Sequence, residues 1–173
     1  MKNFFIKDIQ KNEEDVLSLE EAKLALRVTT DHDDLLINSL LHAALEFAEQ
    51  YIGRYIQKRQ ITALFNSVST KEILLSDIGI LAVKMIKINN SEDEILREGE
   101  GFTFCNNKIL LHRAYKDKNL EIIYISGFEV LPESIKQGIL LHLYMLYDKE
   151  VMDKDMKESL LLLYKPFRNL RIF

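Results

Sequence analysis

One long segment, residues 29–54, constrains the fold more than any other part of the chain. Its apolar residues recur at steps of three and four in two adjacent stripes, Leu36, Leu40, Ala44, Phe47 and Tyr51, and Ile37, Leu41, Leu45, Ala48 and Ile52. This spacing predicts an amphipathic helix with a wide apolar face. Thr30 and Asp33 have the spacing of an N-terminal capping box, and Gly53 stands where a left-handed C-terminal cap is expected. Such a helix spans roughly 33 Å, so the other elements should pack against it.

Three shorter segments also predict helices. Ser18 and Glu21 form a second capping box at the start of residues 18–27. Pro132 and Glu133 suit the start of a helix at residues 133–148, whose stretch from Ile135 to Tyr147 is apolar on nearly every side. Such a helix must be covered all round, either by the rest of the chain or by another subunit. The last helix, residues 158–164, should end before Pro166.

Between the helices, residues from about 60 to 128 alternate with the period of strands. Asn106 and Asn107 separate two short apolar runs and predict a β-hairpin, because asparagine tolerates the positive φ of a two-residue turn. A one-residue slip in the alternation of residues 81–88 predicts a β-bulge. Residues 120–128 are apolar on both faces, which predicts a central strand.

The fold class expected from these patterns is α+β, mainly helical, with a small antiparallel β-sheet inserted between the helices. We expect residues 1–17 to form a flexible N-terminal arm, because they are polar and aperiodic. A single domain should follow at residues 18–164, with helices at 18–27, 31–53, 133–148 and 158–164. Residues 165–173 should form a C-terminal docking tail.

Composition excludes several classes of protein. The 173 residues carry a formal net charge of −4 and one cysteine, so no disulfide can form within the chain, and a reducing compartment fits. No apolar run approaches the roughly 18 residues of a membrane span, and the N-terminus lacks the features of a signal peptide, so we expect a cytoplasmic protein. The acidic balance argues against an extensive nucleic-acid surface and leaves a local basic patch open.

Residue types that carry chemistry are present, but their spacing does not favour catalysis. Asp31, His32, Asp33 and Asp34 are consecutive, so on a helix their side chains would diverge by about 100° each and could not converge on one ion. Structural roles are favoured for His112 and His142, and an inert, buried or half-buried thiol for Cys105. No phosphate-binding loop, dinucleotide turn or nucleophile elbow occurs. We therefore expect no catalytic, cofactor-binding or metal-binding residues.

Two segments together resemble the gp6-like head–tail connector proteins of tailed phages, in the long form found in prophages and gene transfer agents. The first is S-L-E-E-A-K-L-A-L-R-V followed by T-D-H-D-D-L-L-I-N-S-L-L-H-A-A-L-E-F-A-E-Q-Y-I-G-R. The second is I-I-Y-I-S-G-F-E-V-L-P-E-S-I-K-Q-G-I-L-L-H-L-Y-M-L-Y-D-K-E, and the closing P-F-R-N-L-R-I-F is similar to the family's aromatic-basic end. The resemblance covers more than half of the chain.

The resemblance implies a structural adaptor. Family members form a ring, typically dodecameric, between the portal protein and a neck or tail completion protein, and DNA passes through the channel without specific binding. Subunits would assemble in the cytoplasm of a bacterial host and end in the virion neck, and the isolated protein can be monomeric. Ring interfaces join two different surfaces, for which we expect Leu41, Leu45, Ile139, Leu143, Tyr144 and Tyr147. For docking on the portal we expect the tail residues Phe167, Arg168, Leu170, Arg171 and Phe173.

Two other functions stay open from the residues alone. One is a small metal-dependent hydrolase that uses His32, Asp33 and a distant His112 or His142. The other is a monomeric, prophage-encoded module that binds a protein partner. Metal-dependent stabilisation would indicate the first, and ring assembly would argue against both.

Overall fold

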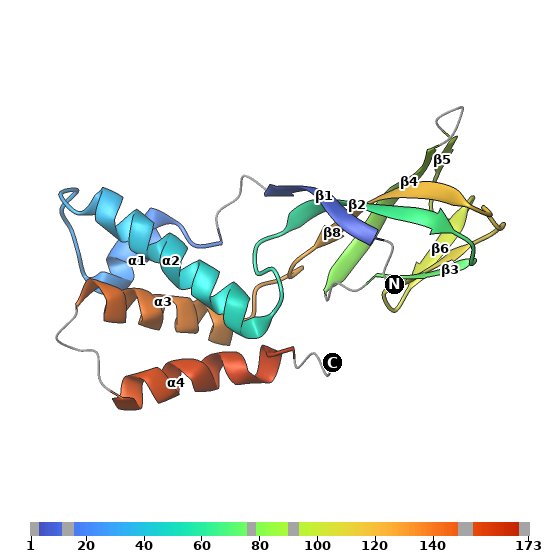
Figure 1. Ribbon diagram of the computed structural model, residues 1–173. Helices are drawn as coiled ribbons and strands as arrows, with labels where there is room; N and C mark the ends of the chain where they lie inside the picture. Colours follow the sequence, from blue (N-terminus) through green and yellow to red (C-terminus); the bar gives the residue numbers. More distant parts are fainter. Residues whose placement is uncertain (1–3, 12–15, 76–78, 90–93, 149–153, 170–173) are drawn as a thin grey trace. The chain divides into compact units, whose positions relative to one another are not determined.

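A computed structural model describes residues 4–11, 16–75, 79–89, 94–148 and 154–169. Backbone contacts divide the chain into two compact units (Figure 1). The helical unit comprises Glu14–Ile56 and Val130–Phe173, and the β unit comprises Met1–Glu13 and Gln57–Glu129. The sequence analysis had expected one connector domain over residues 18–164. None of the helices in the described part of the chain has both the length and the apolar character that a membrane crossing requires.

The expectation of a mainly helical fold is wrong. The structure is 38% helical and 34% strand. Its strands form two antiparallel sheets, one of five strands and one of three. The strand content was underestimated because several strands are short or lie at a sheet edge, where the alternation of apolar and polar residues is weak.

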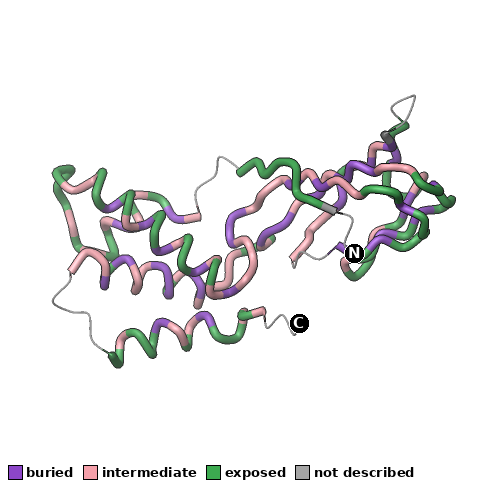
Figure 2. The backbone as a smooth tube through the Cα atoms, viewed as in Figure 1, coloured by how far each residue is buried: buried purple, intermediate pink, exposed green. Residues whose placement is uncertain are grey.

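The helical unit contains α1 (Leu19–Leu26), α2 (Asp34–Ile52), α3 (Glu133–Tyr147) and α4 (Lys154–Tyr164), followed by the 3₁₀ turn η2 (Lys165–Phe167). Helix α2 packs mainly on α3, and α3 also contacts α1 and α4. One stripe of α2 is buried and forms the centre of this unit: Ile37, Leu41, Ala44, Ala48 and Ile52. Of the neighbouring stripe, Leu36 and Phe47 remain exposed, so the apolar face of α2 is only partly covered (Figure 2).

The ends of the helices match the expected caps in part. Ser18 and Glu21 form the predicted capping box of α1, and Gly53 ends α2 in the left-handed conformation, with φ of 73°. The capping box at Thr30 is wrong, because α2 begins only at Asp34 and its N-cap residue Asp33 makes no side-chain cap. The acidic residues there bind other helices instead, since Lys23 of α1 forms ion pairs with Asp31 (2.6 Å) and Asp34 (2.7 Å).

The β unit contains a five-stranded antiparallel sheet in the order β1-β2-β8-β4-β5. Its strands are β1 (Phe4–Lys11), β2 (Arg59–Val68), β4 (Ile80–Asn89), β5 (Glu94–Leu96) and β8 (Lys118–Ser126). Strand β8 is central, as its apolar character predicted. The predicted bulge is confirmed as well, because the pairing of β4 with β8 shifts between Val83 and Met85. The face that carries Ile61, Ile86 and Ile122 is fully buried.

A three-stranded sheet in the order β3-β7-β6 completes this unit. It consists of β3 (Glu72–Leu74), β6 (Phe102–Cys105) and β7 (Lys108–Leu111). The predicted hairpin is present between β6 and β7, and its turn residues Asn106 and Asn107 have φ of 50° and 60°. These angles are those of a primed hairpin turn, which explains why two asparagines occupy it.

The expectation of a flexible N-terminal arm is wrong for residues 4–11, which form strand β1. The strand pairs with β2 from Phe4 opposite Phe65 to Lys11 opposite Arg59, and the Lys7 ammonium lies 2.9 Å from the Glu121 carboxylate. Strand β1 is the edge of the sheet and is exposed from Phe5 to Lys11 (Figure 2). An edge strand needs no strictly buried face, so its sequence lacks a clear period of two.

Candidate interaction surfaces

The residue types that suggested chemistry have structural roles or lie at the surface. His32 is exposed, and Asp31 pairs with Lys23. The Tyr147 hydroxyl donates a hydrogen bond to Asp33 (2.7 Å), which raises the pKa of Tyr147. Among the residues that the structure describes, no group of three His, Cys, Asp or Glu side chains is placed to hold a metal ion.

The remaining reactive side chains make contacts within their own units or lie at the surface. His112 of the β unit lies within hydrogen-bond distance of the Glu100 carbonyl (3.0 Å). His142 of α3 packs edge-on against Phe47 of α2, and burial lowers its pKa. Cys105 is exposed, which corrects the expectation of a buried or half-buried thiol. It ends β6 beside the hairpin turn, where the side chain points away from the buried face of the small sheet.

The predicted subunit interface divides into buried and accessible residues. Ile139 and Leu143 are fully buried within the helical unit, and Leu41 is 7% exposed. These three therefore stabilise a single copy and are not available to a neighbour, which corrects that part of the prediction. Leu45 and Tyr147 are half-buried, and Tyr144 is 36% exposed. Only these three remain candidates for contact with another subunit.

Two of the three accessible residues line a groove in the helical unit, which we call the α1–α3 groove. It has a volume of about 700 Å³ and lies where α1 and α3 end. Its walls are Ala25, Leu26 and Arg27 on one side and Tyr144, Tyr147 and Asp148 on the other. The residues of α1 were missed by sequence reasoning. The sequence carried no signal for them, because Arg27, which ends α1 in the left-handed conformation with φ of 57°, is not the glycine that usually marks such a helix end.

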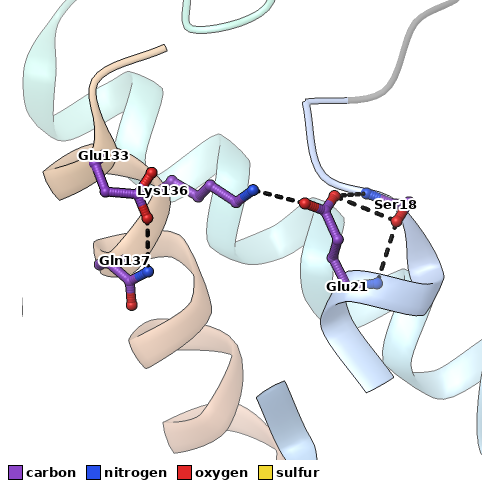
Figure 3. A network of polar contacts seen from close by, with 5 residues as sticks. All are labelled: Ser18, Glu21, Glu133, Lys136 and Gln137. Carbon is purple, nitrogen blue, oxygen red and sulfur yellow. Dashed lines mark hydrogen bonds and ion pairs between the residues drawn. The ribbon is translucent and has the colours of Figure 1, made fainter. Parts of the chain in front are cut away.

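A polar network joins α1 and α3 near their N-terminal ends, away from the groove (Figure 3). The Lys136 ammonium of α3 lies 2.6 Å from the Glu21 carboxylate of α1. The same carboxylate accepts a hydrogen bond from the Ser18 backbone N–H (2.9 Å), so the capping box and the ion pair use the two oxygens of one carboxylate. The hydrogen bond from Lys136, followed by that from Ser18, lowers the pKa of Glu21.

Helix α4 is fixed to α3 by a close contact between Tyr164 and Gly138. Both residues are buried, and a Cβ atom at position 138 would lie 2.8 Å from the Cζ atom of the tyrosine ring. Glycine is therefore required at position 138 by the fit of the two helices, although it lies in the middle of α3. The burial of Tyr164 raises the pKa of its hydroxyl group.

The first part of the predicted docking tail folds back on the helical unit. The Asn169 backbone N–H donates a hydrogen bond to the Ile52 carbonyl (2.8 Å), and the Arg168 guanidinium lies 5.0 Å from the centre of the Tyr51 ring. Phe167 is half-buried in the turn η2. The other predicted docking residues, Leu170, Arg171 and Phe173, lie outside the described residues.

The fold and the sequence both match known proteins. Residues 15–158 match the model of a family described as head completion protein. A chain in the neck of an empty GTA particle, computed with C6 symmetry, has a TM-score of 0.71 at 16% identity, and the match covers 96% of this chain and 97% of that one. A chain of the virion of a native gene transfer agent (GTA) particle has a TM-score of 0.71 at 15% identity, with coverage of 95% and 97%.

A third similar structure is the neck of a native GTA particle computed with C12 symmetry, with a TM-score of 0.61 at 16% identity and coverage of 95% and 97%. No curated protein matches in sequence. At these identities the structural matches show a shared fold over nearly the whole of each chain. The family match covers most of the sequence and confirms the connector resemblance of the two motif segments. The chain therefore belongs to the head completion protein family.

Proposed function

We propose that this protein is a head–tail connector subunit of a tailed phage or prophage and forms a ring between the portal and the neck or tail proteins. The observation that carries the proposal is the family match over residues 15–158. The shared fold with GTA neck chains, over nearly the full length of both partners, supports it. The role is structural rather than enzymatic, with assembly in the host cytoplasm and a final place in the virion neck.

The ring is a homo-oligomer, and a neck structure computed with C12 symmetry supports a count of twelve copies. Closed rings use heterologous interfaces, in which two different surfaces of the same protein meet. We assign one surface to the α1–α3 groove with Tyr144 and Tyr147, and the other to the exposed apolar residues near the start of α2. There Leu35 is 89% exposed and Leu36 is 51% exposed, which is unusual for leucines so close together. Leu45, the third accessible residue of the predicted interface, also lies on α2, between Leu36 and Gly53.

The tail is proposed to dock on the portal through Phe167, Arg168, Leu170, Arg171 and Phe173. Arg168 and Asn169 contact the helical unit, and these contacts are kept when only residues 170–173 are removed. Deletion of residues 170–173 keeps all the described contacts and should abolish portal binding while the melting temperature stays the same. Undiminished portal binding by the shortened chain would remove this assignment.

The ring interface is tested by a pair of matched substitutions. Tyr144→Asp places a charge in the α1–α3 groove, and Leu162→Asp places the same charge at an exposed site on α4. Each purified variant is mixed with the portal protein of the same phage and imaged by negative-stain electron microscopy. We expect rings from the wild type and from the Leu162 variant, but none from the Tyr144 variant. Normal rings from the Tyr144 variant would refute the interface without refuting the connector role.

A further inference from the structure

The outer edge of strand β1 is the longest sheet edge without a neighbouring strand in the described part of the chain. Strand β1 has eight residues, whereas the other edge strands, β3, β5 and β6, have three or four. Three large apolar side chains on β1 are well exposed, at 51% for Phe5, 41% for Ile6 and 39% for Ile9. An edge strand offers its backbone N–H and C=O groups to a strand of another chain. The ring contacts proposed above lie on helices and leave this edge unused.

A β-bulge at Lys7 determines which side chains of β1 share a face of the sheet. The pairing with β2 shifts by one residue between Ile6 and Asp8, so Lys7 is an extra residue on β1. Ile6 and Ile9 lie opposite two alternate residues of β2 and therefore share one face, although they are not alternate residues of β1. Phe5 and Asp8 share the other face for the same reason. The bulge thus makes the pattern of faces symmetric about the bond between Lys7 and Asp8.

This symmetry allows β1 to pair with β1 of a second copy in one antiparallel register. Side chains that lie opposite each other on two neighbouring strands share a face. With a two-fold axis between Lys7 and Asp8, Ile6 of each copy lies opposite Ile9 of the other, and both are on the same face. An axis at either of the two central residues would oppose side chains from different faces, so those registers are excluded. Without the bulge, Ile6 and Ile9 would lie on different faces and could not meet.

The charges that meet in this register are complementary. Glu121 is on the face of Asp8, because it lies opposite the same residue of β2 as Phe5 does. The Lys7 ammonium is 2.9 Å from Glu121 and therefore reaches that face too. Lys7 of each copy then lies opposite Asp8 of the other. Asp8 pairs with no cation among the residues that the structure describes, and it accepts a hydrogen bond from the Gln10 amide (3.0 Å). An ammonium group has three donors, so Lys7 can bind both carboxylates.

We infer that two copies of this chain pair through β1 and join their five-stranded sheets into one. The dimer combines backbone hydrogen bonds with two Ile6–Ile9 contacts and two Lys7–Asp8 ion pairs, which are of the types that stabilise neighbouring strands. Bulges and lysines normally protect an edge from other strands. Here the second copy carries the same bulge at the same place, and its Asp8 meets the lysine, so neither feature obstructs the pairing.

The dimer goes beyond the proposed ring. Adjacent copies in a ring meet through two different surfaces, whereas in this dimer the same strand meets itself. The contact is therefore not one of those that close the ring. It describes the free protein before it meets the portal.

Sedimentation of the isolated full-length chain tests the dimer directly. The mass should rise with concentration from the 20.2 kDa of one chain to twice that value. Hydrogen exchange should slow with concentration at alternate amides of β1, because only every second N–H group of an edge strand points outward. A chain that stays monomeric up to roughly 1 mM, where even weak specific contacts form, would overturn the inference. A dimer that leaves the exchange of β1 unchanged would also overturn it, because its contact would lie elsewhere.

Charge variants test the register. D8K places lysines opposite lysines, and K7D places aspartates opposite aspartates, so each variant alone should stay monomeric. An equal mixture of the two should form a heterodimer, because every lysine again meets an aspartate. D8N removes the attraction without adding repulsion and should weaken the wild-type dimer by roughly 2- to 30-fold, since two cross-strand pairs are lost. Undiminished dimerisation of D8K, or no heterodimer from the two folded variants, would contradict the inference.

A matched pair of substitutions keeps the test decisive if K7D, which also loses its contact with Glu121, does not fold. I9K introduces a lysine on β1, and I95K introduces one on β5 at the opposite edge of the same sheet. The two isoleucines are similarly exposed, at 39% and 48%. I9K should abolish the dimer and I95K should leave it intact, with melting temperatures showing that both remain folded. Equal effects of the two variants would mean that β1 is not the contact.

The outcome is separable from the proposed function because the experiments use no portal. If the free chain pairs through β1 and forms no ring on the portal, the connector proposal fails and the dimer stands. If rings form on the portal and the free chain is monomeric, the dimer fails and the connector role stands.

Discussion

Replacement of Gly138 by alanine tests how α4 is attached to α3. The new Cβ atom would lie 2.8 Å from the Cζ atom of Tyr164 and closer still to its Cε1 atom, whereas real contacts of this kind are not shorter than about 3.0 Å. The ring is fully buried and cannot move into solvent without undocking α4. Overpacking of this kind costs about 1–3 kcal/mol of unfolding free energy. Alanine in place of glycine within a helix returns about 0.5–1 kcal/mol. The net loss should therefore lie between about 0 and 2.5 kcal/mol.

Urea unfolding measures this loss, and hydrogen exchange should show faster exchange of the α4 amides. A double-mutant cycle supplies the control, because Tyr164→Leu removes the ring that the methyl group meets. In that background Gly138→Ala should be neutral or should stabilise the protein by up to about 1 kcal/mol. If Gly138→Ala stabilises the otherwise unchanged chain, the close fit of the two helices is not what holds α4.

Three further predictions concern the helical unit. Ser18→Ala removes the N-cap of α1 and should cost about 1 kcal/mol in urea unfolding, while no change would show that the capping box is not formed. Tyr164→Phe removes a buried hydroxyl that has no hydrogen-bond partner among the described residues, so it should leave the stability unchanged or raise it, and a loss of more than 1 kcal/mol would contradict the described environment. Glu21 has a lowered pKa, so its contribution is present above the ordinary value of 4.5 and is lost as the pH falls through the lower pKa of the folded state. Between pH 6 and pH 3 the wild type should therefore lose more stability than Glu21→Gln does, and parallel curves would refute the ion pair with Lys136.

The four helices α1–α4 could be predicted from the sequence because their apolar residues recur at helical spacing, although α4 begins at Lys154 and not at the expected residue 158. The start of α2 could not, since Asp31, Asp33 and Asp34 suit a helix N-terminus and also suit partners elsewhere in the fold. Lys23 of α1, eight residues from Asp31, and Tyr147 of α3, 114 residues from Asp33, supply those partners. Local capping patterns cannot reveal a competition of this kind.

The strands, too, could be predicted from the sequence only in part. The hairpin at Asn106 and Asn107 and the central strand β8 have strong local signals, and both were predicted. Strand β1 is stabilised by pairing with β2, 48 to 61 residues away in the sequence from Lys11↔Arg59 to Phe4↔Phe65, and by the ion pair between Lys7 and Glu121. The sequence of β1 itself shows little sign of this pairing. The edge strand was therefore predicted to be part of a flexible arm.

The interaction surfaces were predicted less well than the fold elements. The apolar character of α3 on all sides indicated that something must cover it, but could not distinguish α2 and α4 of the same copy from a second subunit. Ile139 and Leu143 turn out to be covered within one copy, whereas Tyr144 and Tyr147 line the α1–α3 groove. Part of α3 is covered by α4, because Gly138 in the middle of α3 leaves room for the large Tyr164 side chain of α4.

The most direct test of the connector role is the mass of the complex that this protein forms with the portal of the same phage. Native mass spectrometry of the purified mixture counts the copies of each chain. The connector role predicts a closed ring of identical copies on the portal, twelve if the ring follows the C12 symmetry of the related neck. Failure to bind the portal, or binding of a single copy without ring closure, would contradict it.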